Sequence, residues 1–175
     1  LLLLENGDNL GIGAGLNRGL YAAEVMTGIE WALLLDQDSV PLPGMIGKFA
    51  EVYATLPQPG CIAQISANFV EAAGGPEGYP FRRFGERIWM YSDTSQTSGT
   101  LLSLRAWRAA GALREDFFLY WLDVEYGLRL RRLGWRTVLT REPLMVHETG
   151  NTRAVHLAGQ TVALQEYVPE RHYFL

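Results

Sequence analysis

Two carboxylates stand one residue apart, at Asp36 and Asp38, directly after the apolar run 32–35. The run predicts a buried strand, and open α/β sheets bind ligands beyond the carboxyl ends of their strands. Two like charges at such a partly desolvated edge repel each other, and a divalent cation would remove that repulsion. An acidic turn continued by Ser39 and Pro41 is the simpler alternative. We therefore interpret the pair as a candidate cation site, weighed against a plain turn.

Length and composition indicate one globular domain. The chain has 175 residues, 48% of them hydrophobic, which is enough for a sizeable core. The formal charge of -4 and the pI near 5.4 supply no net positive field for a phosphate backbone, so we expect no nucleic-acid partner. The single cysteine, Cys61, excludes an internal disulfide, and no apolar stretch reaches the roughly 18 residues of a membrane span.

The first half of the chain alternates strands and helices. Residues 1–4 form an apolar run that we expect to be a strand already within the sheet. A glycine-rich entry at 11–19 opens a helix, and the acidic strand follows. Apolar residues at helical spacing predict a second helix over 45–56, before a short strand at 61–65. This alternation favours a parallel sheet with right-handed crossovers.

The second half contains the clearest helix signal. Residues 71–97 break the pattern and are typical of a long binding loop or lid. A strand follows at 98–104, where Ser103 is placed to cap a short helix. The apolar stripe over 122–133 predicts a helix with acids in its first turn and arginines in its last, which suits the helix dipole. Strands at 136–140 and 144–147 then complete the α/β pattern.

Five motifs in order resemble the family 2 inverting glycosyltransferases, and among them the rhamnosyltransferase branch. The residues that carry the resemblance are Asn9 to Gly19, Leu35 to Ser39, Thr97 to Leu101, Phe117 and Phe118 with Asp123, Val124, Glu125 and Arg129, and His147 with Gly150. Their order and spacing agree over nearly the whole chain. The resemblance implies an enzyme that moves a sugar, with rhamnose expected, from a nucleotide-diphosphate donor to a hydroxyl.

The same resemblance implies a fold. It is the GT-A fold, an α/β, Rossmann-like architecture with a mixed, mainly parallel sheet flanked by helices. Residues 1–175 would then form a single glycosyltransferase domain that lacks the family's N-terminal strand-helix-strand unit and a C-terminal segment.

The resemblance also implies roles for particular residues. Asp38 and His147 would hold Mg²⁺ or Mn²⁺, and Asp123 would be the base that deprotonates the acceptor hydroxyl. The residues expected at the donor are Asp36, Gly11, Asn17 and Arg171. Two of these roles have plain alternatives, because Asp123 could simply cap its helix and His147 could be a satisfied, partly buried histidine.

Partners and location follow from the same family. The donor would be dTDP-rhamnose or a UDP-sugar, and the acceptor a cell-surface polysaccharide or its lipid-linked precursor. We accordingly expect a cytoplasmic protein that associates peripherally with the inner face of the cell membrane in cell-wall polysaccharide biosynthesis.

Two other functions fit parts of the sequence. The first is a non-catalytic module that binds a sugar nucleotide or saccharide. The second is a haloacid-dehalogenase-like phosphatase, because Asp36 to Val40 matches the nucleophile loop of that family. The phosphatase chemistry also needs a downstream lysine and a further acidic pair. Lys48 follows the loop too closely, and no later Asp-Asp pair occurs.

Overall fold

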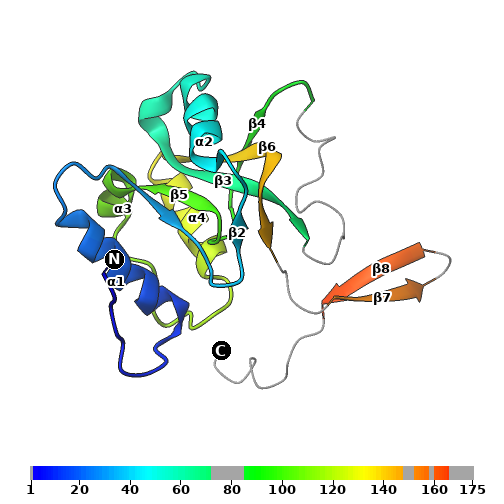
Figure 1. Cartoon of the computed structure of the whole chain (residues 1–175), viewed down its shortest axis with the longest axis horizontal. Helices are drawn as coiled ribbons and strands as arrows, with labels where there is room; N and C mark the ends of the chain where they lie inside the picture. Colours follow the sequence, from blue (N-terminus) through cyan, green and yellow to red (C-terminus); the bar gives the residue numbers. More distant parts are fainter. Residues whose placement is uncertain (1, 72–84, 148–151, 158–159, 166–175) are drawn as a thin grey trace.

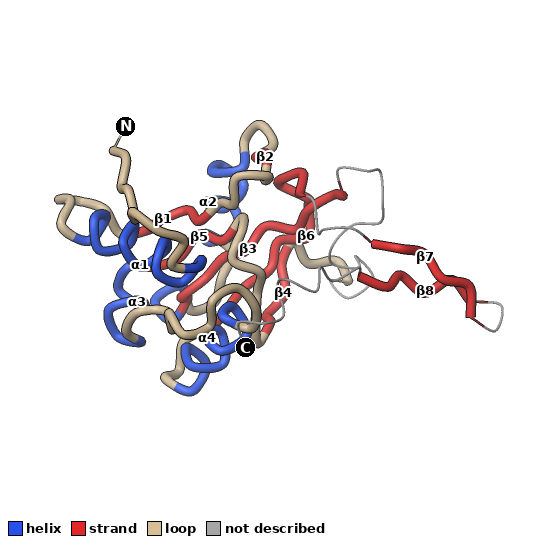
Figure 2. The backbone as a smooth tube through the Cα atoms, turned by 90° about the horizontal axis from the view of Figure 1, so that it is seen from below, coloured by secondary structure: helices blue, strands red, loops and turns tan. Residues whose placement is uncertain are grey.

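A computed structural model describes residues 2–71, 85–147, 152–157 and 160–165. A mixed sheet lies between two layers of helices, as Figures 1 and 2 show. The helices are α1 (Gly11–Glu24), α2 (Met45–Ala54), α3 (Leu104–Ala110) and α4 (Leu122–Arg132), with a 3-10 turn at Pro59–Cys61. In Figure 2, α2 lies on one side of the strands, and α1, α3 and α4 lie on the other.

The main sheet has six strands in the described part of the chain. They are β1 (Trp31–Leu34), β2 (Val40–Pro41), β3 (Ile62–Glu71), β4 (Trp89–Ser92), β5 (Thr100–Ser103) and β6 (Arg136–His147). Their order is β1-β5-β3-β6-β2, and β4 also pairs with β6. A separate antiparallel hairpin joins β7 (Thr152–Leu157) to β8 (Gln160–Gln165).

The expectation of a mainly parallel sheet is wrong for the described strands. Only β3 and β6 pair in parallel, and the other four pairings within this sheet are antiparallel. The strands β1 and β3 do point the same way, but β5 lies between them in the opposite direction. The alternation of strands and helices correctly predicted that β1 and β3 run in the same direction. It did not indicate that a later strand, β5, would insert between them.

Each helical layer encloses its own apolar cluster. The first packs α2 on one face of the sheet through residues including Phe49, Val52, Ile65, Phe69 and Met145. The second packs α1, α3 and α4 on the other face through residues including Leu20, Leu102, Trp107, Tyr126 and Leu130. Side chains alternate between the two faces along a strand, so one sheet supplies both cores.

Several local predictions are confirmed. Ser103 caps α3, since its hydroxyl accepts a hydrogen bond from the backbone N–H of Ala106. Glu125 and Arg129 pair across one turn of α4 at 2.8 Å. The two strands expected at 136–140 and 144–147 form one continuous strand, β6.

Other local predictions fail. Residues 2–4 adopt no strand and are largely exposed, because no described strand runs beside them to accept their hydrogen bonds. Within the expected loop at 71–97, residues 89–92 form β4, which pairs with β6, and residues 72–84 lie outside the described part.

In the described residues no helix is long and apolar enough to cross a membrane.

Candidate functional site at the carboxyl end of β1

Three segments far apart in sequence meet where β1 ends. The backbone N–H of Gly99 donates to Leu34 O at 2.9 Å, which holds the turn before β5 against the end of β1. On the other side, Val40 of β2 pairs with Val146 of β6, so Ser39 lies next to His147. The acidic loop 36–39 is therefore fixed between the turn 97–99 and the end of β6.

A chain of hydrogen bonds connects these segments. Ser98 Oγ accepts from the backbone N–H of Asp36 at 3.0 Å and lies 2.6 Å from Ser39 Oγ. Ser39 Oγ in turn lies 2.7 Å from Nδ1 of His147, which is 3.6 Å from a carboxylate oxygen of Asp38. The ring of Phe69 meets the imidazole edge-on at 5.5 Å. The two residues predicted to bind metal are thus neighbours, and a serine orients one of them.

The two serines were missed as site residues in the sequence. Ser98 lies within the motif Thr97 to Leu101, so its position was marked, but nothing in the sequence indicates a hydrogen bond that spans 59 residues to Ser39. Their pairing depends on the sheet order, which the sequence did not predict.

Gly99 is required at this edge for two reasons. Its φ of +71° lies in the left-handed region, and a Cβ there would overlap the sulfur of Met145 and lie 3.2 Å from Ala67 Cβ. Its carbonyl also accepts from the N–H of Ala67 at 2.9 Å. The glycine lets the turn lie directly on the sheet and keeps Ser98 against the acidic loop.

Burial raises the pKa of the Asp36 carboxyl, and the nearby charge of Asp38 raises it further, while His147 lowers it. The repulsion expected between the two acids is therefore present in the structure. An ion or a protonated group near the pair would relieve it.

The donor set suits a hard cation in part. No cluster of three His, Cys, Asp or Glu side chains that could hold a metal occurs among the described residues. Asp38 and His147 are neighbours, and because Nδ1 of His147 contacts Ser39, Nε2 is the ring nitrogen left for an ion. Mg²⁺ is commonly bound by one or two protein groups with the remaining ligands from water and substrate phosphate. The residues present thus fit a metal that arrives with a diphosphate, and their metal role stays a prediction.

The direction of α4 orients its first turn, which contains Asp123, toward the same end of the sheet. Only residues 133–135 separate α4 from β6, so the helix runs antiparallel to β6 and its first turn points toward the end of the sheet where β1 stops. Asp123 is half-buried, and burial raises the pKa of its carboxyl, while hydrogen bonds from the backbone N–H groups of Val124 and of Asp123 itself lower it. A carboxyl in this setting is suited to take up a proton.

Asp123 is not the N-cap residue of α4, although its carboxylate accepts hydrogen bonds from backbone N–H groups of the first turn. The cap position belongs to Trp121, which has a φ of +66° and makes no side-chain capping bond. A left-handed conformation costs an ordinary residue about 1–2 kcal/mol, and it is rare for a bulky one. The strain is placed two residues before Asp123, at the point where the chain turns into α4.

The glycine-rich entry packs α1 against the chain segment that precedes α4. A Cβ on Gly11 would lie 2.6 Å from Phe118 O, and one on Gly13 would lie 2.9 Å from Arg114 O. Asn17 is 1% exposed, and its amide makes 2.9 Å hydrogen bonds to the backbone N–H and carbonyl of Leu113 and to Glu115. The glycines thus allow α1 to pack closely against the loop that precedes α4, and not against the sheet.

The expected donor contacts of Gly11 and Asn17 stay predictions. Arg171 lies outside the described residues, so the structure says nothing of its role. Asp36 is the expected donor residue that lies in the polar network described above.

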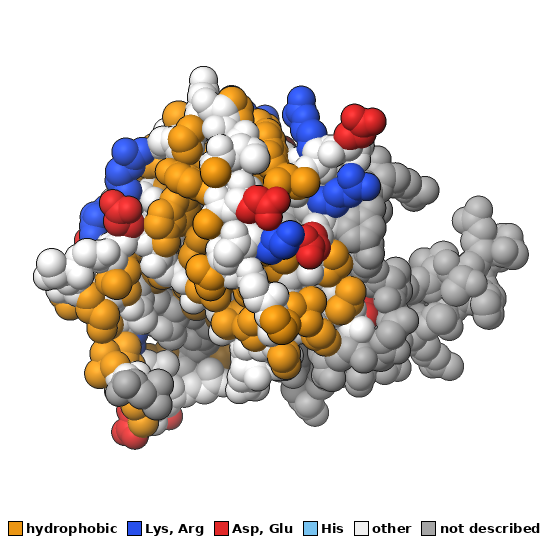
Figure 3. Space-filling model, turned by 45° about the horizontal axis from the view of Figure 1, so that its top comes forward, with side chains coloured by type: hydrophobic (Ala, Val, Ile, Leu, Met, Phe, Trp, Pro, Cys, Tyr) orange, Lys and Arg blue, Asp and Glu red, His pale blue; other side chains and the backbone are white. Residues whose placement is uncertain are grey.

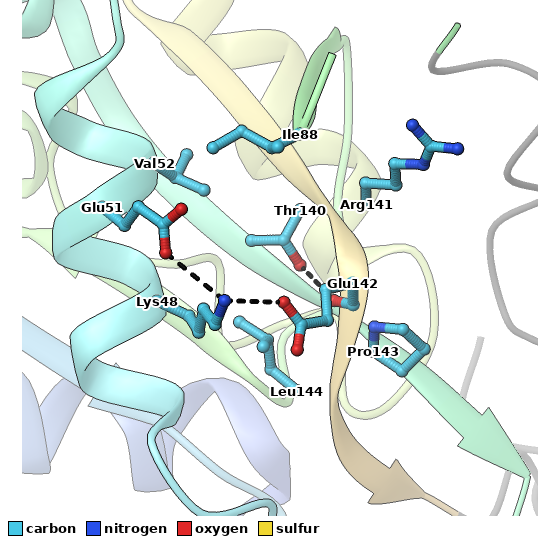
Figure 4. Close-up of a pocket in the computed structure, with 9 residues that line it drawn as sticks. All are labelled: Lys48, Glu51, Val52, Ile88, Thr140, Arg141, Glu142, Pro143 and Leu144. Carbon is cyan, nitrogen blue, oxygen red and sulfur yellow. Dashed lines mark hydrogen bonds and ion pairs between the residues drawn. The ribbon is translucent and has the colours of Figure 1, made fainter. Parts of the chain in front are cut away.

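The position of Lys48 bears on the phosphatase alternative, because this lysine is engaged away from the acidic loop. It forms ion pairs with Glu51 at 3.4 Å and Glu142 at 3.0 Å, as Figure 4 shows. These residues line a cavity of about 360 Å³ between α2 and β6, together with Val52, Ile88, Thr140, Arg141, Pro143 and Leu144. A lysine engaged there does not serve a nucleophile at Asp36.

No family model matches the chain. Two curated proteins of Mycobacterium tuberculosis, from strains CDC 1551 / Oshkosh and ATCC 25618 / H37Rv, are each 24% identical to it over 213 residues. The alignment covers 97% of this chain and 67% of each relative. Both relatives are named N-acetylglucosaminyl-diphospho-decaprenol L-rhamnosyltransferase. The chain is therefore similar to a glycosyltransferase over nearly its whole length, which supports the resemblance seen in the motifs.

Proposed function

We propose that this chain is an inverting glycosyltransferase that moves a sugar from a nucleotide-diphosphate donor to a hydroxyl of a saccharide. The proposal rests on one arrangement: Asp36, Asp38 and His147 are gathered where β1 ends, and α4 directs Asp123 toward that end of the sheet. The name of the relatives favours rhamnose as the sugar and a lipid-linked saccharide as the acceptor.

The donor half would use the acidic loop. Asp38 and His147 would hold Mg²⁺ or Mn²⁺, and the ion would neutralise charge on the departing diphosphate. Asp36 would accept hydrogen bonds from hydroxyls of the ribose or the transferred sugar. Ser39 and Ser98 keep the loop and the imidazole in place for both contacts.

The acceptor half would use Asp123. Its carboxylate would take the proton from the acceptor hydroxyl as the hydroxyl oxygen attacks the anomeric carbon from the face opposite the diphosphate. A base acts best when its pKa lies near the working pH, and burial shifts the pKa of Asp123 in that direction.

Thermal melting with metal and nucleotide tests the donor half. A ligand that binds only the folded state raises the melting temperature by mass action. We expect dTDP or UDP to raise it when Mn²⁺ is present and to do so less when EDTA replaces the metal. Asp38→Asn should remove the metal-dependent part, whereas Glu142→Gln, at the Lys48 cavity, should keep it.

Transfer itself is tested by incubating dTDP-rhamnose with an N-acetylglucosaminyl diphosphate that carries a short prenyl chain. Formation of the rhamnosylated product with inverted configuration supports the proposal. Release of inorganic phosphate from simple phosphate esters, without sugar transfer, would instead support the phosphatase.

A further inference from the structure

Trp121 is the exception among the five tryptophans of the chain. Trp89 and Trp107 are buried, and Trp31 and Trp135 are half-buried within their clusters. Trp121 is 60% exposed. An indole is among the largest apolar groups a protein can bury, so leaving this one in solvent forgoes much stabilisation.

The backbone at Trp121 makes its exposure more informative. It is the only residue other than glycine with a positive φ in the described part of the chain. Glycine would adopt this conformation without strain, whereas a bulky aromatic residue is disfavoured there. Such outliers cluster at ligand sites, where the surrounding structure holds them. Here the first turn of α4 does so, since the Glu125 N–H donates to Trp121 O at 2.9 Å.

The surroundings of Trp121 combine apolar and polar groups. Leu119, two residues before it, is 37% exposed, and Asp123, the proposed base, follows two residues after it. Its indole makes no hydrogen bond, ion pair or ring contact with any residue that the structure describes, so its N–H remains available as a donor. An exposed aromatic face with a free donor, two residues before a carboxylate in the sequence, matches a molecule that has both C–H faces and hydroxyls.

We infer that Trp121 is the platform on which the sugar ring of the acceptor stacks. One face of a pyranose presents C–H groups that pack on an aromatic ring, while its hydroxyls reach the rim of the ring and the carboxylate beyond it. Stacking here would bring an acceptor hydroxyl toward Asp123. The inference rests on the proposed function. It assigns to Trp121 a role in binding the acceptor and none in binding the donor.

The test uses the full chain with dTDP-rhamnose and the N-acetylglucosaminyl diphosphate that carries a short prenyl chain. Trp121→Gly removes the platform and suits the left-handed backbone, so we expect its melting temperature to stay equal or rise. The KM for the acceptor should rise by more than twofold and up to about tenfold, the size of one lost stacking contact, while the Kd for dTDP with Mn²⁺ stays unchanged. Trp121→Phe should restore most of the acceptor affinity.

Ile46→Ser provides a matched control, because Ile46 is 59% exposed on α2, on the other face of the sheet. Its acceptor KM should equal that of the wild type. The inference is overturned if the acceptor KM of Trp121→Gly stays within about twofold of the wild-type value. A variant that loses self-association in size-exclusion chromatography but keeps this KM would overturn it too, because Trp121 would then be a contact between protein copies. It is also overturned if Ile46→Ser raises the KM equally. If the wild type neither binds dTDP nor transfers sugar, the proposed function itself fails, and this inference fails with it.

Discussion

Asp123 lies in a partly buried position where an ionised carboxylate lowers the stability of the folded state. Burial raises the pKa of its carboxyl, so the folded state favours the protonated form more than the unfolded chain does. The contribution of this group to stability is therefore complete below the unfolded pKa and is lost as the pH rises through the folded pKa. At neutral pH the ionised side chain destabilises the fold, which is common for groups retained for function.

Replacing Asp123 by asparagine should separate these two effects. At pH 7 we expect Asp123→Asn to melt at a temperature equal to or above that of the wild type, because no buried charge remains. Transfer should fall by about 10²–10⁴-fold, the usual contribution of a general base. Melting curves and a transfer assay measure both. Full turnover in the variant would show that Asp123 is not the base, and donor binding without turnover in the wild type would favour the non-catalytic module.

Ser39 should act through His147. Its hydroxyl lies 2.7 Å from Nδ1 of the imidazole, and removing such a supporting hydrogen bond to a metal-binding histidine typically lowers metal affinity 10–100-fold. We expect Ser39→Ala to weaken Mn²⁺ binding by about that factor in an electron paramagnetic resonance titration. Ser95→Ala is the control, because the Ser95 hydroxyl is buried with no hydrogen-bond partner in the described structure. Equal Mn²⁺ affinity in both variants would argue against the positioning role.

Among the elements, α1 positions the segment that leads to α4. Asn17 satisfies both backbone groups of Leu113, and Arg129 of α4 donates to the carbonyls of Ala110 and Ala112 from the other side. The loop between α3 and α4 is thus fixed by two helices. Its conformation sets where Trp121 and Asp123 lie.

Asn17→Ala should accordingly affect both stability and turnover. The variant leaves the buried N–H and carbonyl of Leu113 without their partner, which costs about 1–3 kcal/mol per group. We expect a loss of roughly 2–6 kcal/mol in urea unfolding and a fall in kcat that exceeds the change in donor affinity. Asn9→Ala is the control, since Asn9 is exposed and makes a single 3.2 Å bond to the Gly11 N–H. A stability loss in the control as large as in Asn17→Ala would contradict this account.

The helices were predictable because their signals are local. The apolar spacing of α2 and α4 and the capping serine of α3 depend on residues within a few positions of one another. The position of β5 between β1 and β3 was not, because it depends on pairing across the whole chain. The same holds for the site: the acidic pair was visible in sequence, whereas the approach of Ser39 to His147, 108 residues apart, required the register of β2 on β6.

At the scale of the whole molecule, no large patch of one charge sign marks a binding face in the view of Figure 3. Lys and Arg side chains there lie beside Asp and Glu side chains, with apolar groups between them. The ion pairs given by the structure are largely exposed, and such pairs contribute little to stability. On this face recognition would depend on local groups, and at the ends of β1 and β6 a network of polar side chains converges.

Hydrogen exchange across the full chain should locate the donor without prior choice of a site. Loops exchange through local opening, and a bound ligand that requires the closed form slows that exchange. With Mn²⁺ and dTDP together, we expect slower exchange in peptides that cover residues 36–39 and 97–99, because these segments meet at the end of β1. Peptides from α2 should exchange as in the free protein. Protection centred instead on α2 and residues 140–144 would place the nucleotide in the Lys48 cavity and refute the assignment to the acidic loop.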